Sequence, residues 1–160
     1  MKKQPWKTYA FWILLTVLTG ALAGLLTRDA TQIYNETIVK PPLSPPAVLF
    51  PVVWSILYVL MGVSAARVSL TPRTDDRFNG LRVYLVQLAF NFLWSILFFT
   101  FQAFGFAFVW LLVLWGLILA MILLFRRTDK AASLLQIPYL LWVTFAGYLN
   151  LGVWLLNRSF

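Results

Sequence analysis

The stretch FGFAFVWLLVLWGLILAMILLF, from Phe104 to Phe125, contains no charged residue and is long enough to cross a lipid bilayer as a helix. Roughly 20 apolar residues in helical form span the hydrocarbon core of a bilayer. Four further apolar runs of similar length occur along the chain, at residues 9–26, 46–66, 83–102 and 131–156. We therefore predict an all-α integral membrane protein, a bundle of five transmembrane helices that forms a single domain over residues 1–160.

The composition of the chain supports this assignment. Of its 160 residues, 61% are hydrophobic and only 11% are charged, far from the usage of a soluble domain. The lysines at positions 2, 3 and 7, followed by an apolar run, also resemble a secretory signal peptide. That run continues to Leu26 and exceeds the usual core of about 7 to 15 residues, which favours a transmembrane helix.

The net charge of +8 is distributed unevenly between the two sides of the predicted bundle. The amino terminus, the second loop and the fourth loop share one side and carry Lys2, Lys3, Lys7, Arg67, Arg73, Arg77, Arg82, Arg126, Arg127 and Lys130. The other side carries only Arg28, Lys40 and Arg158. By the positive-inside rule we expect a multi-pass protein of the cell membrane with a cytoplasmic amino terminus, and with the first loop and the carboxyl terminus outside. The charge thus indicates topology, and we expect no nucleic-acid partner.

Several kinds of chemistry are excluded by the residues that the chain lacks. It has no His and no Cys, so thiol and Ser-His nucleophiles, zinc sites and the usual haem ligands are excluded, and we predict no metal site. Its acids, Asp29, Glu36, Asp75, Asp76 and Asp129, all fall outside the predicted spans. Ion-coupled transporters keep ionisable residues at membrane depth, where they are functional. Conventional acid/base catalysis and proton-coupled pumping are therefore not expected.

Neutral polar and aromatic residues recur at helical spacing within three of the spans. The third span has Gln87, Asn91, Trp94, Ser95, Phe98 and Gln102 on one face, the fifth has Tyr139, Trp142, Ala146, Asn150, Trp154 and Asn157, and the second has Trp54, Ser55 and Tyr58. Exposure to lipid would leave these polar groups without partners, so we expect them to point inward. Spacing alone favours hydrogen bonding between helices over the lining of a ligand pocket, and it leaves both open.

The first loop is rich in proline. It reads KPPLSPPAVLFPVVW from Lys40 to Trp54, and proline restricts both its own backbone and that of the residue before it. We predict a stiff extended strap over the end of the bundle, with Pro46 in the first turn of the second helix. Pro51 is expected inside that helix, where it would bend the chain just before Trp54.

Three segments resemble the TspO/MBR family of tryptophan-rich sensory proteins, translocator proteins and peripheral benzodiazepine receptors. They are Lys40-Pro41 with Ser44-Pro45-Pro46 and Trp54, then Asn91-Phe92-Leu93-Trp94-Ser95 with Phe98-Phe99, and then Pro138-Tyr139-Leu140-Leu141-Trp142 with Phe145-Ala146 and Leu149-Asn150. The resemblance covers nearly the whole chain in order. It implies a five-helix bundle, often a homodimer, that binds porphyrins of the protoporphyrin IX class and other hydrophobic drug-like ligands. It also implies a pocket inside the bundle, closed by the first loop.

From this resemblance we expect a porphyrin-binding membrane receptor or sensor-like protein, for which the porphyrin is a ligand and no cofactor is required. The expected ligand-binding residues are Pro45, Trp54, Tyr58, Asn91, Trp94, Ser95, Trp142, Ala146 and Asn150. Light-dependent degradation of protoporphyrin in bacterial members implies an enzyme-like alternative, with Trp54 and Trp142 as its photochemical residues. A passive tetrapyrrole transporter or scaffold is a further alternative. Lys40 and Arg28 are candidates to meet the porphyrin propionates, or they extend to the membrane interface.

The chain departs from the family pattern at several positions. Leu43 replaces a usual Trp, and Tyr34-Asn35 replaces a usual Trp-Tyr, so the loop has less aromatic surface. Leu151 occupies the Tyr position of the cholesterol-recognition pattern, so sterol binding is not supported. The small-residue spacing of Gly20 and Gly24 allows close helix approach, either in a dimer or within one subunit.

Overall fold

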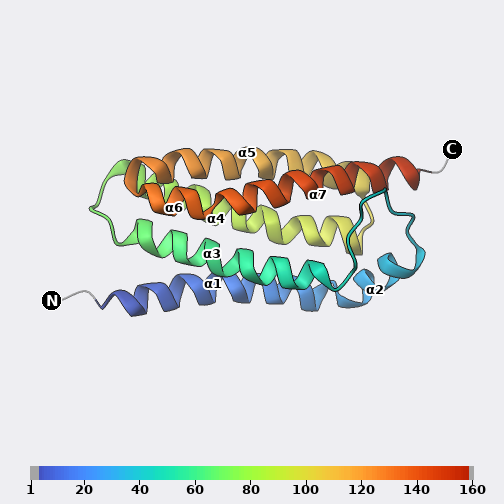
Figure 1. Cartoon of the computed structure of the whole chain (residues 1–160), viewed down its shortest axis with the longest axis horizontal. Helices are drawn as coiled ribbons and strands as arrows, with labels where there is room; N and C mark the ends of the chain where they lie inside the picture. Colours follow the sequence, from blue (N-terminus) through green and yellow to red (C-terminus); the bar gives the residue numbers. More distant parts are fainter. Residues whose placement is uncertain (1–3, 159–160) are drawn as a thin grey trace.

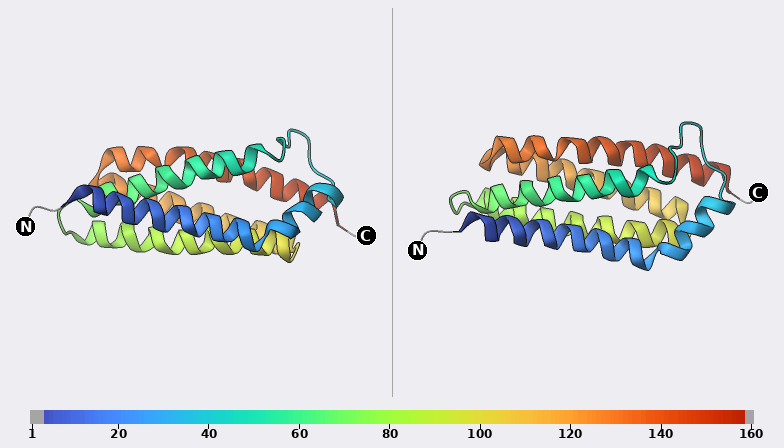
Figure 2. Two further views of the ribbon diagram at one scale, coloured as in Figure 1. Left: turned by 90° about the horizontal axis from the view of Figure 1, so that it is seen from below. Right: turned by 60° about the horizontal axis from the view of Figure 1, so that its bottom comes forward.

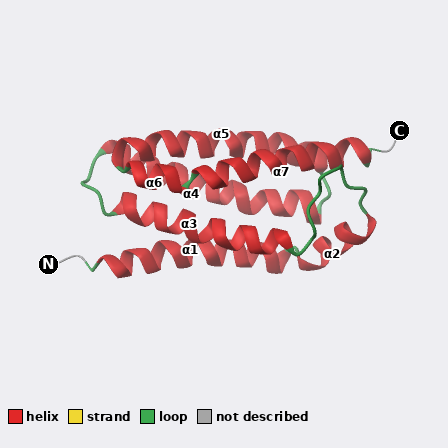
Figure 3. Cartoon of the chain, viewed as in Figure 1, coloured by secondary structure: helices red, strands yellow, loops and turns green. Residues whose placement is uncertain are grey.

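Five long helices lie side by side in the computed structural model, which describes residues 4–158 (Figure 1). They are α1 (Pro5–Leu26), α3 (Leu49–Ser69), α4 (Asp75–Ser95) with a π-helical turn η1 (Ile96–Thr100), α5 (Phe104–Thr128), and α6 (Lys130–Leu135) with α7 (Ile137–Leu156). A short helix, α2 (Arg28–Thr37), follows α1. No strand occurs among the described residues (Figure 3). All five long helices have the length and apolar composition of membrane spans, so the predicted fold class is confirmed.

The helices form a closed bundle with two different ends. Helix α1 packs along α3 and α4, α4 along α5, and α5 along α7, whereas α3 packs on α6 and touches α7 only lightly. One end carries α2 and the carboxyl terminus, and the amino terminus lies at the other end (Figure 1). The segment between α2 and α3 arches over the α2 end (Figure 2). The end that faces the cytoplasm stays a prediction from the charge distribution. Two of the basic residues used for that prediction, Lys2 and Lys3, lie outside the described residues.

Several helices extend beyond the apolar runs that predict them. Helix α4 begins at Asp75, well before residue 83, because Thr74 caps it by accepting a hydrogen bond from the N–H of Arg77 at 3.2 Å. Asp75 and Asp76 in the first turn also interact favourably with the positive end of the helix dipole. The first turns of α4 are polar, so a search for apolar runs does not detect them. Helices α1 and α5 likewise begin or end several residues outside the predicted ranges.

The predicted role of Pro51 is wrong. Helix α3 begins at Leu49, so Pro51 lies in its first turn, where an N–H has no partner within the helix. A proline in the first turn breaks no helical hydrogen bond and gives no reason for a bend before Trp54. The prediction that Pro46 lies in the first turn is also wrong: Pro46 precedes the helix, in a turn where its carbonyl accepts from the N–H of Leu49 at 2.9 Å.

The third span also ends differently from the prediction. After Ser95 the helix widens into the π-helical turn η1, and it stops at Thr100. Gln102 then adopts a positive φ of 48°, in the left-handed region, and is exposed. Gln102 therefore does not share the inward face of α4, and that part of the prediction is wrong.

The fifth span is divided at Gln136, between α6 and α7. Pro138 has no N–H to donate to the preceding turn, which interrupts the helical hydrogen bonds at this point. Helix α7 resumes with the N–H of Leu140 bonded to the carbonyl of Gln136 at 3.1 Å. Both helices together cover the predicted range of 131–156.

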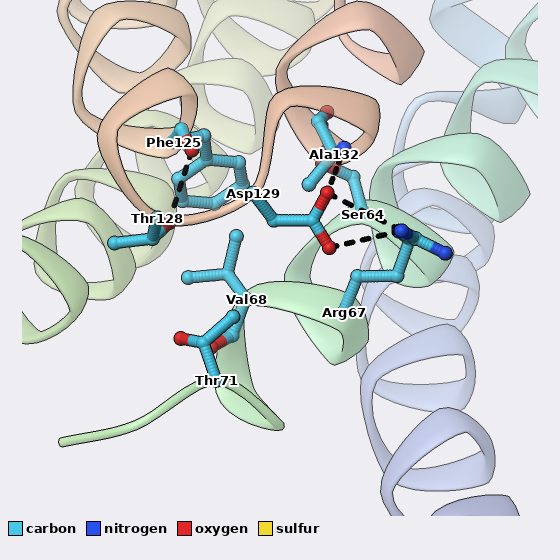
Figure 4. A network of polar contacts seen from close by, with 8 residues as sticks. All are labelled: Ser64, Arg67, Val68, Thr71, Phe125, Thr128, Asp129 and Ala132. Carbon is cyan, nitrogen blue, oxygen red and sulfur yellow. Dashed lines mark hydrogen bonds and ion pairs between the residues drawn. The ribbon is translucent and has the colours of Figure 1, made fainter.

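A polar cluster fastens the end of the bundle opposite α2 (Figure 4). Arg67 of α3 forms an ion pair with Asp129 at 3.0 Å. The Asp129 carboxylate also caps α6 by accepting from the N–H of Ala132 at 3.1 Å, and Ser64 donates to the carbonyl of Ala132 at 2.7 Å. Helix α3 is thus tied to the turn between α5 and α6.

The ion pair predicts a loss of stability in acid. Burial opposes ionisation of Asp129, but the N–H of Ala132 and the Arg67 guanidinium outweigh it and lower the pKa of that carboxyl. A folded-state pKa below the unfolded value of about 3.9 contributes stability that is complete above that value. This contribution disappears as the pH falls through the lower folded value. We expect Asp129→Asn to unfold at a lower temperature than wild type at pH 7, with the difference shrinking below about pH 4.

Asp76→Asn is the matched control, since the Asp76–Arg127 pair is longer, at 3.5 Å, and more exposed. Thermal unfolding in one detergent at several pH values measures both variants. A constant difference between Asp129→Asn and wild type down to pH 3 would contradict this account.

Candidate functional site

A cavity of about 520 Å³ lies at the α2 end of the bundle, between α1, α3, α4 and α7. Its volume is within the range of small-molecule sites, about 300 to 1,000 Å³. Eight aromatic residues belong to its wall: Tyr34, Phe50, Trp54, Tyr58, Trp94, Phe98, Phe99 and Trp142. Such a lining favours a flat, apolar ligand that is able to stack on the rings.

The structure brings together most of the residues that the sequence predicts for the site. Those that line the cavity are Trp54, Tyr58, Trp94, Ser95, Trp142, Ala146 and Asn150. The rings of Trp54 and Trp142 meet edge to face, with centroids 6.5 Å apart and planes at 88°. Trp54 also stacks on Tyr58 at 5.5 Å, and Phe50 contacts Trp142 at 5.8 Å. The two tryptophans therefore belong to one aromatic cluster on the cavity wall.

Asn91 lies behind this wall and does not line the cavity. Its side-chain oxygen accepts from the Tyr58 hydroxyl at 3.0 Å, and its amide nitrogen donates to the Tyr139 hydroxyl at 2.8 Å. Tyr139 in turn donates to Gln87 at 2.7 Å. These residues hydrogen-bond α3, α4 and α7 to one another. In this part of the bundle the polar stripes connect helices, and Asn91 fixes the orientation of Tyr58.

Asn150 both lines the cavity and connects helices. Its side-chain oxygen accepts from the indole N–H of Trp94 at 3.1 Å, and its amide nitrogen donates to the carbonyl of Phe104 at 2.8 Å. This pair holds the Trp94 ring against the cavity. By contrast, the indole N–H of Trp142 is enclosed and has no acceptor among the described residues. Trp142 therefore contributes the apolar surface of its ring to the cavity wall.

The proline-rich strap between α2 and α3 is fastened to the end of α7. The backbone N–H of Val39 donates to the side chain of Asn157 at 3.0 Å, and Asn157 donates back to the carbonyl of Val39 at 2.8 Å. The Tyr148 hydroxyl donates to the carbonyl of Pro42 at 2.7 Å. The strap is thus held in place by side chains of another helix as well as by its prolines.

A smaller cavity of about 220 Å³ lies under the strap and adjoins the main one. Its walls are Tyr34, Asn35, Lys40, Ser44, Pro45, Ala47, Phe50 and Leu149, of which five also line the main cavity. Pro45, a predicted site residue, is placed here. Leu43 is 83% exposed, has a φ of 67° and lines neither cavity.

Helix α1 contributes to the site in a way that the sequence analysis missed. The cavity is lined on this side by Val17, Gly20, Ala21, Ala23, Gly24 and Thr27. A Cβ added to Gly20 would lie 2.1 Å from the Tyr58 ring, so Gly20 packs within the chain, whereas Gly24 faces open space. Ala21 and Gly24 of α1 and Pro51 and Ser55 of α3 are exposed, and they form an open side of the cavity between these helices. The predicted homodimer stays a prediction.

Fold and cavity together define a five-helix membrane protein with an aromatic internal pocket beneath an ordered loop. The family model described as the TspO/MBR family matches residues 12–155, and the chain belongs to this family. It is 39% identical to the tryptophan-rich protein TspO of Chlorobaculum tepidum over 94% of this chain and 96% of the relative. It is 37% identical to protein CrtK of Rhodobacter capsulatus, over 93% and 92% of the two chains. It is 32% identical to the translocator protein of Bos taurus, over 96% and 92%.

Proposed function

We propose that this protein is a receptor or sensor that binds porphyrins of the protoporphyrin IX class, and related flat hydrophobic molecules, in the main cavity. The observation that carries the proposal is the cluster of aromatic rings around a cavity of about 520 Å³. Stacking on such rings adds about 0.5 to 1.5 kcal/mol per contact beyond the burial of apolar area. A titration of the purified protein with protoporphyrin IX, followed by quenching of tryptophan fluorescence, tests this function.

Ala146 offers a test of where the ligand lies. Its small side chain is 8% exposed and lines the cavity on α7. Ala146→Thr adds volume to a close-fitting wall, and overpacking of this kind costs about 1 to 3 kcal/mol. We expect the affinity for protoporphyrin to fall by roughly ten- to a hundredfold while the protein stays folded.

The control is Thr144→Ser, a substitution on the same helix, α7, that keeps the hydroxyl group. Thr144 is exposed, donates to the carbonyl of Leu140 and does not line the cavity. The affinity of the Thr144→Ser protein for protoporphyrin should equal that of wild type. An unchanged affinity in a stable Ala146→Thr protein would place the ligand elsewhere.

The contact between Trp54 and Trp142 favours a second candidate function, light- and oxygen-dependent degradation of the bound porphyrin. An excited porphyrin stacked on this pair would lie next to two easily oxidised indole rings. Illumination of the loaded protein distinguishes the candidates, because an enzyme-like protein would process successive porphyrin molecules. A receptor would at most bleach the single molecule that it holds.

A further inference from the structure

Lys40 lies in the wall of the smaller cavity, where the end of α2 holds its ammonium group. The Lys40 Nζ is 3.0 Å from the carbonyl oxygen of Asn35 and 3.4 Å from those of Tyr34 and Ile38. It also lies 5.0 Å from the centre of the Tyr34 ring. The last carbonyls of a helix carry the negative end of its dipole, so they attract a cation, and among these only the carbonyl of Tyr34 also accepts a backbone N–H, from Ile38 at 3.2 Å. The ammonium of this cavity-lining residue is therefore held at the end of α2.

The positive charge of Lys40 has no counter-ion among residues 4–158. Carbonyl groups are neutral and orient the ammonium without cancelling its charge. The ion pairs found in this range, Arg67–Asp129 and Arg127–Asp76, involve other cations. Glu36, an acid of α2 itself, accepts instead from Gln32 at 3.2 Å. An anion placed beside this ammonium would be stabilised by its positive charge.

The other walls of the smaller cavity are compatible with an anion. The Ser44 hydroxyl donates to the carbonyl of Pro41 at 2.7 Å, so it is fixed within the strap. Burial raises the pKa of Tyr34 to about 12, so its phenol stays neutral at physiological pH. No acidic side chain lines this cavity. Tyr34, Asn35 and Phe50 line both cavities, so a molecule in the main cavity has a short path to Lys40.

We propose that the smaller cavity is an acid-binding annex, in which Lys40 pairs with a carboxylate on a flexible arm of the molecule that occupies the main cavity. The preferred ligand is then an amphipathic acid with a flat apolar body and a carboxylate within reach of the strap. This inference rests on the proposed function and specifies which group of the ligand is recognised. Arg28 and Arg158, the other basic residues near this end, line neither cavity and take no part.

The experiment is a double-mutant cycle in which one change removes the Lys40 ammonium from the protein and the other removes the carboxylates from the ligand. Protoporphyrin IX, which carries two carboxylates, and its dimethyl ester, which carries none, are titrated into wild type and Lys40→Met in one neutral detergent. For each ligand the dissociation constant of the variant is divided by that of wild type, so differences in partitioning into detergent cancel. We expect Lys40→Met to weaken the acid about tenfold more than the ester, as for a partly desolvated charge pair.

Loosening of the α2 end by Lys40→Met would weaken both ligands by the same factor. Lys40→Arg keeps the charge and should restore the preference for the acid. Arg28→Met is the matched control, and it should leave the preference as in wild type. Equal losses for acid and ester in Lys40→Met would overturn the annex while leaving the proposed function intact. Absence of binding of either porphyrin to wild type would overturn both.

Discussion

Replacing Trp54 and Trp142 together by phenylalanine is expected to slow light-driven bleaching of bound protoporphyrin about tenfold or more, because the electron-donating indole rings are then missing. Both residues line the main cavity, and their rings meet at 6.5 Å. An indole readily donates an electron to an excited ligand or traps an oxidant formed beside it, whereas a phenyl ring does not. Binding in the dark should change little, because phenylalanine still supplies a ring for stacking.

Two quantities are measured on each protein: the dissociation constant in the dark, and the initial bleaching rate at saturating protein under fixed light and oxygen. Trp115→Phe is the control. Trp115 lies on α5, donates to Thr144 at 2.9 Å and does not line the cavity, so its loss should alter neither quantity. Equal bleaching by wild type and a folded double variant would exclude the enzyme-like candidate and leave a receptor.

Gly62→Ala is expected to destabilise the bundle by about 1 to 3 kcal/mol, the usual range for overpacking. A Cβ at this position would lie 2.6 Å from the Cα of Ile13 and 3.0 Å from the carbonyl oxygen of Trp12. These are backbone atoms of α1 and are unable to rotate away as a side chain does. The whole of α1 must shift away from α3, which also disturbs the cavity between them.

Gly116→Ala on α5 is the matched control, because a Cβ there meets nothing within 4 Å. Alanine favours a helix over glycine, so this variant should be as stable as wild type or slightly more stable. Thermal unfolding of both variants in the same detergent gives the comparison. If Gly62→Ala unfolds at the same temperature as Gly116→Ala, the close approach of α1 and α3 does not limit stability.

The number of spans could be predicted from the sequence because a bilayer demands a fixed length of apolar helix. The ends of the helices could not, since they depend on capping groups such as Thr74 and Asp129 that lie outside the apolar runs. Helix α2 was missed for a related reason. It is a polar segment, and its one buried residue is Tyr34, which packs on Phe98 at 5.3 Å and Phe99 at 5.2 Å.

The candidate site was only partly predictable for a different reason. Aromatic and polar stripes identify the faces of α3, α4 and α7 that turn inward, but they do not say which residues reach the cavity. Asn91 and Asn150 are the same residue type at equivalent helical spacing, yet Asn91 lies behind the wall and Asn150 lies in it. Helix α1 lines the cavity with small residues such as Gly24, which carry no chemical signal of their own.

The open side of the cavity, where Ala21 and Gly24 face Pro51 and Ser55, has a consequence for how affinity is expressed. Because α1 and α3 have the length and composition of membrane spans, we expect this opening to face the lipid, so that the cavity fills from ligand dissolved in the membrane. A hydrophobic ligand partitions into that reservoir, and its mole fraction there falls as lipid is added at constant total ligand. Apparent dissociation constants calculated from aqueous volume will therefore rise with the lipid-to-protein ratio, whereas constants expressed as membrane mole fractions will stay fixed.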